Sequence, residues 1–291
     1  MSEWKGILVQ MTRTAAIVPT RDRPHALARC LDALDRQQGI DDLEVIVVDD
    51  GSADAHAIAR VVAASDRARL LRCERSLGPA GARNRGARSA GADVVLFTDD
   101  DCEAAPGWAS SMRAAIEGGA DAVAGITVNG RPGSALASAS ETILAYVQER
   151  ARHNGATHFA ATNNVAVSGG VLADVAFDET YRYGEDRDWC ARIVAAGYSL
   201  RVEPSAVVVH SQNLSLPSFV RQQFGYGRGS GRFRRRHAAF RRLEPPGFYG
   251  GLLGRGFEQG VAPGALVVVA QAATAAGFVY ENLRRDQRRT A

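Results

Sequence analysis

VIVVDDGS, residues 45–52, and VVLFTDDD, residues 94–101, are the two stretches of this 291-residue chain that decide its fold. Each begins with a continuous apolar run, which is typical of a strand covered by helices on both faces. Each run ends in adjacent carboxylates. Because open parallel sheets bind ligands beyond the carboxyl ends of their strands, we predict an α/β fold with an acidic ligand site at one sheet edge.

The flanking sequence supports this interpretation, because short β-branched runs alternate with amphipathic stretches. The further segments that we predict are strands at Ala15 to Val18 and, at an edge, Leu70 and Leu71, and helices from Pro24 toward Gly39, over Ala55 to Ala64, from Gly78 and Pro79, and over Glu141 to Arg150. We read the segment from Asn163 to Asp188, rich in glycine, aspartate and tyrosine, as site-building loops. The expected fold is a Rossmann-like, mostly parallel mixed sheet flanked by helices.

The bulk composition is that of a soluble globular protein, with 46% hydrophobic and 23% charged residues. The four cysteines, Cys30, Cys73, Cys102 and Cys190, are widely spaced, form no CxxC pair and follow no secretory signal. Neither a zinc site nor a disulfide framework is therefore expected, and a reducing cytoplasm fits best.

The basic charge is concentrated in one segment, because eight arginines and no acid lie from Arg221 to Arg242 although the whole chain carries only +3. Val261 to Tyr280 is nearly apolar and predicts a buried or interfacial helix. The arginines, assisted by Arg284, Arg285, Arg288 and Arg289, could meet an acceptor's phosphate or anionic lipid on the inner face of a membrane. A basic helix packed on the catalytic domain is the alternative, and a nucleic-acid arm is disfavoured because no nucleic-acid-binding fold frames it.

The carboxylates Asp99, Asp100 and Asp101 would repel one another unless a cation neutralised them. Oxygen ligands suit Mg²⁺ or Mn²⁺, particularly when substrate phosphates complete the shell. The alternative is a solvated loop whose acid only caps the next helix. Asp49 and Asp50 could accept hydrogen bonds from an imide N–H or a ribose hydroxyl, although the same residues also build ordinary turns.

A third acidic group, GEDRDW at residues 184–189, leads into a further predicted helix. A carboxylate placed here beside an acceptor hydroxyl could take its proton. Because helix N-termini attract acids for electrostatic reasons alone, this trio carries weight only together with the other motifs.

The combined pattern resembles the family 2 glycosyltransferases, which are inverting enzymes of the GT-A fold. The resemblance runs from about Ala15 to His210 and rests on AIVPTRDRP, VIVVDDGS, GPAGARNRG, VVLFTDDDCEAAPGW, TNNVAVS, FDETYRYGEDRDWCARIVAAGY and VVVH, in that order. The joint spacing is more specific than any single motif.

On the donor side, the resemblance implies that Pro19 and Asp50 contact the nucleobase with Asp49 as support. It places Arg83 and Asn84 in the nucleotide pocket. The remaining positions that it implies are Asp99 toward ribose and metal, Asp100 beside them as a nucleotide-side spacer, and Asp101 on the metal.

On the acceptor side, the resemblance implies that Asp186 is the catalytic base, with Glu185 and Trp189 in the acceptor pocket. His210 is similar to a histidine that joins the metal shell in some GT-A enzymes, although a lone histidine after an apolar strand is more often structural.

The function implied is inverting transfer of a sugar from a nucleotide-diphosphate donor, with UDP or dTDP favoured, to an acceptor hydroxyl, with Mn²⁺ or Mg²⁺. The expected organisation is a catalytic domain at 1–212, divided into nucleotide-binding (about 14–125) and acceptor-binding (about 126–212) halves, and a helical extension at 213–291. No QxxRW motif follows the base, so processive polymer synthesis is disfavoured.

Two rival functions remain at this point: a nucleotidyltransferase, and a non-catalytic nucleotide-sugar- or carbohydrate-binding protein on the same scaffold. The first usually has a glycine-rich phosphate loop near its N-terminus, where this chain has PTRDR at residues 19–23. The second would be expected to have lost the acids. The sequence leaves the acceptor and the oligomeric state open.

Overall fold

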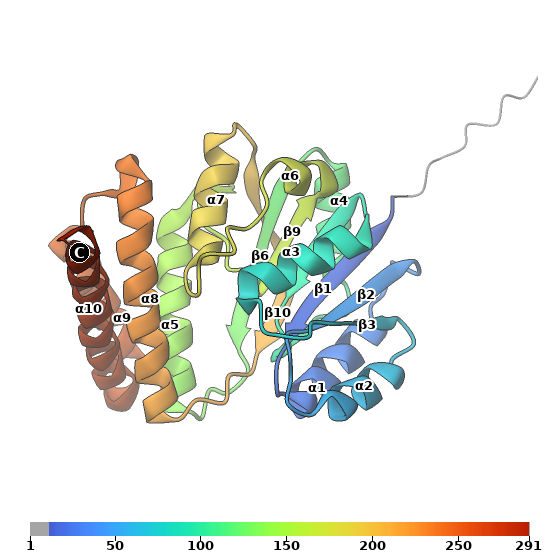
Figure 1. The fold of residues 1–291 in the computed structure, drawn as a ribbon, viewed down its shortest axis with the longest axis horizontal. Coiled ribbons are helices and arrows are strands. Elements are labelled where there is room, and N and C mark those ends of the chain that lie inside the picture. The colour runs from blue at the N-terminus through green and yellow to red at the C-terminus, as the bar shows by residue number, and fades with distance from the viewer. Residues whose placement is uncertain (1–11, 291) are drawn as a thin grey trace, which may run out of the picture.

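The computed structural model describes residues 12–290 and contains one mixed sheet with helices on both faces (Figure 1). The strands are β1 (Thr14–Thr20), β2 (Leu43–Asp49), β3 (Ala68–Arg72), β4 (Val94–Thr98), β5 (Cys102–Ala104), β6 (Ala122–Asn129), β7 (Arg152–His153), β8 (Ala156–Thr157), β9 (Asn164–Ser168) and β10 (Leu200–His210). The helices are α1 (Pro24–Asp35), α2 (Ala55–Ala63), α3 (Gly78–Ala90), α4 (Trp108–Glu117), α5 (Ala135–Ala151), α6 (Gly169–Asp174), α7 (Glu185–Ala195), α8 (Leu216–Arg236), the 3₁₀ turn η1 (Ala238–Phe240), α9 (Pro246–Glu258) and α10 (Val261–Thr290).

The strand order is β3-β2-β1-β4-β9-β6-β10-β8-β7, and β5 pairs with β10 outside this path. Strands β3, β2, β1 and β4 are mutually parallel, as the βαβ pattern predicts. Strand β9 runs antiparallel between β4 and β6, and this reversal makes the sheet mixed. The prediction of a mostly parallel mixed sheet is confirmed.

Alternate residues of the central strands enter two separate cores. Val45 and Val47 face the core under α1, α2 and α4, whereas Ile46 and Val48 face the core under α3, α6 and α7. All four side chains are fully buried. The continuous apolar run is therefore explained by helices on both faces.

Two segments differ from the sequence-based prediction. Helix α5 begins at Ala135 rather than near Glu141, because the Ser134 side chain accepts the Ala137 N–H at its N-terminus. The stretch Asn164–Ser168, read as part of a loop, is the buried strand β9.

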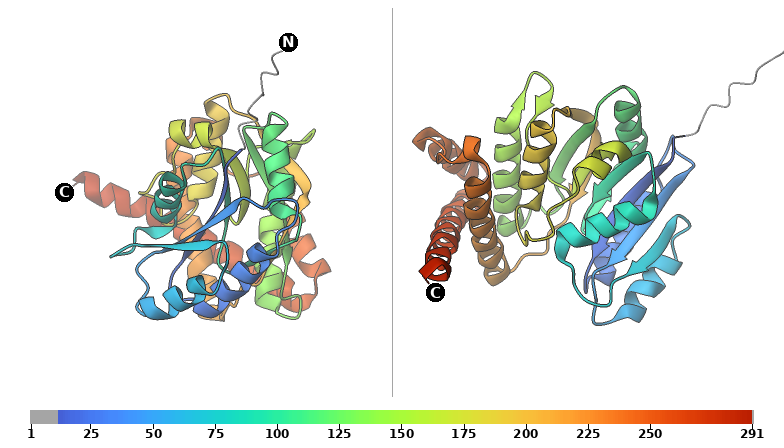
Figure 2. Two further views of the ribbon diagram at one scale, coloured as in Figure 1. Left: turned by 90° about the vertical axis from the view of Figure 1, so that its right-hand side faces the viewer. Right: turned by 45° about the horizontal axis from the view of Figure 1, so that its top comes forward.

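A third core joins α5 to the C-terminal helices, which lie together at the end of the sheet away from β3 (Figures 1 and 2). Its fully buried members are Ala139, Phe219, Leu252, Val267 and Ala270. Within α10, the stretch Val261–Arg284 is long and apolar enough to cross a membrane, judged by length and composition. The side chains of Arg285, Arg288 and Arg289 lie outside the described part of the structure.

Glycines of α8 allow unusually close backbone packing. A Cβ atom at Gly227 would overlap the Thr274 carbonyl of α10, and one at Gly277 would overlap the Phe224 carbonyl of α8. A Cβ atom at Gly229 would overlap the Tyr183 carbonyl, just before α7. Helix α8 is therefore fitted against α10 and against the loop that leads into α7.

Candidate active site

Carboxylates from two of the three acidic groups predicted from sequence line one cavity of about 650 Å³. Asp99 and Asp101 follow β4, while Glu185 and Asp186 open α7. The short strand β5 is antiparallel to β10 and sets Cys102 opposite His210, which brings Asp101 beside that histidine. Among the cavity-lining residues are Arg23, Arg83, Asp99, Asp101, Glu141, Glu185, Asp186 and His210.

Two arginines provide the positive charge that the three adjacent aspartates require. Buried Arg83 bridges Asp99 Oδ1 at 2.6 Å and Glu185 Oε1 at 2.9 Å. Arg23 contacts Asp100 Oδ1 at 2.5 Å and Asp101 Oδ2 at 2.9 Å. Sequence reasoning missed Arg23, although the need for cations near three clustered acids is a signal that could have directed a search for it.

Asp100 does not line the cavity and is fully buried. Thr20 Oγ1 donates to its Oδ2 at 2.7 Å. Burial raises the Asp100 pKa to about 7, against the opposing effect of Arg23. Asp100 thus links the turn after β4 to Thr20 of β1 and to Arg23 just before α1. Its position gives the predicted nucleotide-side role no support.

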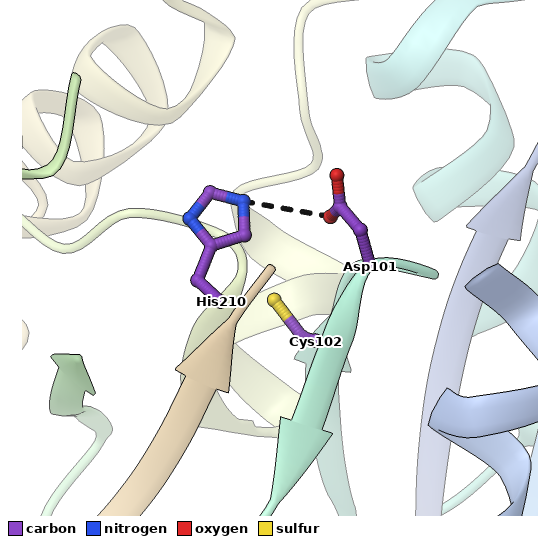
Figure 3. Close-up of side chains that lie close together, drawn as sticks. All are labelled: Asp101, Cys102 and His210. Atoms are coloured by element: carbon purple, nitrogen blue, oxygen red, sulfur yellow. Dashed lines mark ion pairs between the residues drawn. The ribbon is translucent and has the colours of Figure 1, made fainter. Parts of the chain in front are cut away.

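Asp101, His210 and Glu141 form a chain of contacts, of which Figure 3 shows the Asp101–His210 pair. His210 Nε2 lies 3.4 Å from Asp101 Oδ1, and His210 Nδ1 lies 3.1 Å from Glu141 Oε2. Burial disfavours protonated His210, but hydrogen bonds to Asp101 and Glu141 outweigh burial and raise its pKa to about 10. Glu141 was not among the residues that we predicted.

The donor atoms at this point fit a divalent cation. Potential ligand atoms of Asp101, Cys102 and His210 lie within 4.8 Å of one another, and Glu141 Oε1 is buried without a hydrogen-bond partner. Burial raises the Cys102 pKa well above its ordinary value, which disfavours the thiolate form that binds metals. The carboxylate and imidazole groups that remain suit Mn²⁺ better than a thiolate-binding metal.

Asp186 lines the cavity from the first turn of α7. The preceding Gly184 has a φ of 75°, a left-handed conformation that glycine adopts without strain and that turns the chain into the helix. Burial and then the adjacent Glu185 charge raise the Asp186 pKa to about 7. A carboxylate that titrates near neutrality is suited to accept and release protons.

The predicted nucleobase contacts lie outside the cavity lining. Asp50 accepts hydrogen bonds from Ser76 Oγ at 2.6 Å, Leu77 N at 2.6 Å and Gly78 N at 3.0 Å, which fixes the start of α3. Asp49 is paired with Arg72 and accepts the Ser52 N–H at 2.8 Å. Pro19 lies in β1, and its role, like theirs, stays a prediction.

Asn84 and Trp189 have structural positions. The Asn84 amide donates to Phe177 O at 2.9 Å and accepts from Phe177 N at 2.9 Å, so it anchors the chain before α7 rather than facing the cavity. Trp189 is fully buried, donates to Val175 O at 2.7 Å and stacks on Phe177 at 4.4 Å. Because no part of its indole is accessible, the position of Trp189 gives the predicted acceptor contact no support.

The C-terminal helices form a large part of the cavity wall, which sequence reasoning did not anticipate. The residues they contribute include Gln223, Tyr226, Phe233 and Arg234 of α8, Phe248, Tyr249 and Leu252 of α9, and Gln271 and Thr274 of α10. No local motif marks these residues, because they reach the cavity only through the packing of α8, α9 and α10 on α5.

The other arginines of α8 mostly contact protein. Arg228 and Arg235 contact Glu281 of α10, and Arg236 is paired with Asp178. Arg232 Nη1 donates to Thr180 O at 2.8 Å. For these side chains, the alternative of a basic helix packed on the domain describes the structure best.

The mixed sheet with acids at its carboxyl edge and helices on both faces has the architecture of a GT-A-type domain. The model of the family described as "Glycosyl transferase family 2" matches residues 15–175, and the chain belongs to this family. The resemblance inferred from the motifs is thereby confirmed.

Two relatives illustrate the relationship. The pre-mycofactocin glycosyltransferase of Mycobacterium tuberculosis is 31% identical over 221 residues, covering 72% of this chain and 45% of that protein. The succinoglycan biosynthesis protein ExoO of Rhizobium meliloti is 29% identical over 206 residues, covering 67% and 59%. This chain thus spans less than two thirds of either relative.

A solved structure shares the fold: the mannosyltransferase PcManGT from Pyrobaculum calidifontis in complex with GDP-Man and Mn²⁺. The TM-score is 0.59 at 21% sequence identity, and the match covers 92% of this chain and 75% of that one. The match therefore extends well beyond residues 15–175.

Proposed function

We propose that this protein is an inverting, divalent-metal-dependent glycosyltransferase that moves a sugar from a nucleotide-diphosphate donor to an acceptor hydroxyl. The observation that carries the proposal is the shared cavity, which is lined both by the Asp101–His210 pair and by Asp186. The GDP-Man and Mn²⁺ named for PcManGT support a nucleotide-sugar donor and a divalent metal. Family membership disfavours both a nucleotidyltransferase and a non-catalytic binding protein.

The metal shell that we propose consists of Asp101 and His210, with Asp99 on its donor side. A divalent cation held by these residues would supply positive charge that stabilises the donor's departing diphosphate. Arg83 holds Asp99 at 2.6 Å, and Glu141 orients the His210 ring at 3.1 Å. To coordinate a metal through Nε2, His210 must release the proton that Asp101 and Glu141 stabilise.

Asp186 acts in this proposal as the general base. Its Oδ1 accepts the Arg187 N–H at 2.7 Å, which fixes the carboxylate at the start of α7. In the ionised form it takes the acceptor's hydroxyl proton as the oxygen attacks the anomeric carbon from the face opposite the diphosphate. Attack from that face inverts the anomeric configuration.

The donor base that we favour is uracil or thymine, with Asp50 as acceptor of the imide N–H. Asp50 already accepts three hydrogen bonds, which leaves about one of the roughly four acceptor positions of a carboxylate. Guanine also offers an N–H to such an acceptor. UDP-, dTDP- and GDP-sugars are therefore the panel to compare.

The organisation that we propose keeps a nucleotide-binding half at about 14–125 and an acceptor-binding half at about 126–212. Because α8, α9 and α10 contribute to the cavity wall, we assign the helices beyond residue 212 to the acceptor side as well.

We also propose a cytoplasmic protein that rests on an anionic membrane surface through the outer face of α10. Val268, Val269, Val279, Tyr280 and Leu283 are 39–61% exposed there. Co-sedimentation with anionic and neutral vesicles tests this part, and equal recovery in the unbound fraction with both vesicle types would contradict it.

The central test is release of nucleoside diphosphate from the donor panel, with Mn²⁺ or with EDTA. We expect Mn²⁺-dependent turnover with at least one donor and its loss in Asp186→Asn. Hydrolysis that is indifferent to both EDTA and this substitution would refute the proposal.

A further inference from the structure

The side chains of two cavity-lining arginines, Arg187 and Arg234, have no part in the mechanism proposed above. Arg187 follows the proposed base directly, and Arg234 reaches the cavity from the end of α8. The Arg187 side chain is half-buried, whereas that of Arg234 is only 9% exposed. Both arginines thus line the same cavity.

One carboxylate oxygen is the counter-charge that these arginines share. Glu244 Oε1 lies 3.8 Å from Arg187 Nη2 and 3.5 Å from Arg234 Nη2, both beyond ordinary hydrogen-bond length. Arg234 Nη1 donates to the Phe240 carbonyl at 2.9 Å and to the Arg242 carbonyl, but its Nε is buried without a partner. Burial and the positive charge of Arg234 lower the Arg187 pKa. This pair therefore retains unsatisfied capacity to bind an anion.

An aromatic ring also contacts the Arg187 guanidinium. Its guanidinium carbon lies 4.8 Å from the centroid of the Phe233 ring, and stacking on the ring holds the planar group in place. A planar guanidinium held in this way matches the geometry of a phosphate or a carboxylate.

The same cavity also has apolar lining residues. Among them are Ile143, Leu144 and Val147 of α5 and Phe248 and Leu252 of α9. Because one cavity offers both positive charge and hydrocarbon, an amphipathic ligand would satisfy both parts at once.

We propose that Arg187 and Arg234 form an anion subsite for the acceptor, and that the acceptor carries a phosphate or carboxylate group joined to an apolar body. The inference rests on the proposed function, because it takes the Asp186 side of the cavity as the acceptor side. It assigns the C-terminal helices a share in acceptor recognition.

The test uses hexyl phosphate as the probe, with inorganic phosphate and hexyl glucoside for comparison. Binding is measured by calorimetry on the full chain in EDTA, so that no metal-bound phosphate contributes. The variants are Arg187→Gln and Arg234→Lys. Arg221→Gln, an exposed arginine on the same helix outside the cavity, is the matched control for lost charge.

We expect hexyl phosphate to bind more tightly than either comparison compound. Each cavity variant should weaken it by about tenfold or more, the usual effect of losing a charge-assisted hydrogen bond, and the control should leave it unchanged. Arg234→Lys keeps the buried charge and Arg187 is half-buried, so thermal melts without ligand should show that both variants fold. Equal binding by all variants, or equal binding of hexyl glucoside, would overturn the proposal.

Adding UDP with Mn²⁺ separates the acceptor from the donor as the source of the anion. Unchanged affinity for hexyl phosphate supports an acceptor subsite, whereas mutual exclusion would assign the arginines to the donor's diphosphate and overturn the inference. Donor hydrolysis by the unmodified protein is a separate readout. Its absence would refute the proposed function without bearing on whether the arginines bind hexyl phosphate.

Discussion

Replacing Glu185 by glutamine should shift the acid limb of the pH–rate profile to lower pH. Burial and the Glu185 charge raise the Asp186 pKa to about 7, and only ionised Asp186 can accept the acceptor's proton. With that pKa, the ionised fraction is about 9% at pH 6 and about 91% at pH 8, so turnover of the unmodified protein should rise about tenfold. Glu185→Gln removes the neighbouring negative charge and so lowers the Asp186 pKa. The rise in turnover between pH 6 and pH 8 should then be smaller.

The assay is nucleoside diphosphate release at saturating donor and Mn²⁺ between pH 5 and pH 9. Glu149→Gln, on the exposed side of α5 and outside the cavity, is the control and should keep the original limb. Asp186→Asn should lower turnover by about 10²–10⁴-fold and abolish the limb. An unchanged limb in Glu185→Gln, or a shift to higher pH, would refute the assignment of Asp186 as the titrating base.

Three further predictions follow from the same structure. Because the Asp186 pKa is raised in the folded state, ionisation of Asp186 disfavours folding increasingly from pH 3.8 to about 7. Asp186→Asn should therefore have a higher melting temperature than the unmodified protein at pH 8 and the same melting temperature at pH 3. A lower melting temperature at pH 8 would contradict this. Asp101→Ala and His210→Ala should each weaken Mn²⁺ binding by about tenfold or more in calorimetry, and unchanged affinity in both would remove the proposed metal shell. Trp189→Ala should lower the free energy of unfolding in urea by about 3–5 kcal/mol, since its indole is fully buried; a loss below about 1 kcal/mol would contradict its place in the core.

The central fold could be predicted because the composition of its central strands shows that they are buried on both faces. The runs ending at Asp49 and Thr98 are apolar on both faces, and only a doubly covered strand accounts for that. Strand β9 gave no such signal, because Asn163 and Asn164 resemble loop residues. Asn164 is buried instead, accepting from the Trp108 indole N–H at 2.8 Å and donating to Ile126 O at 2.9 Å.

The site was predictable only where a motif names its chemistry. The acids after β4 and at the start of α7 line one cavity, as expected, because each belongs to a motif whose place at an element's end can be read from the sequence. Arg23, Glu141 and the cavity wall from α8 and α9 depend on contacts between segments distant in sequence, which no local pattern records. Trp189 shows the converse, because its place within a motif suggested a ligand contact where the structure requires a core residue.

The glycines of α8 have a consequence for how the chain can be divided. With no side chain at Gly229, the helix backbone lies directly against Tyr183, and His237 Nε2 at the helix end lies 2.9 Å from Asp188 Oδ1 in α7. Residues beyond position 212 therefore contact and support the segment that carries Asp186. A fragment ending at His210 would keep the donor-side carboxylates yet lose the support of the proposed base, so we expect the smallest active fragment to include α8.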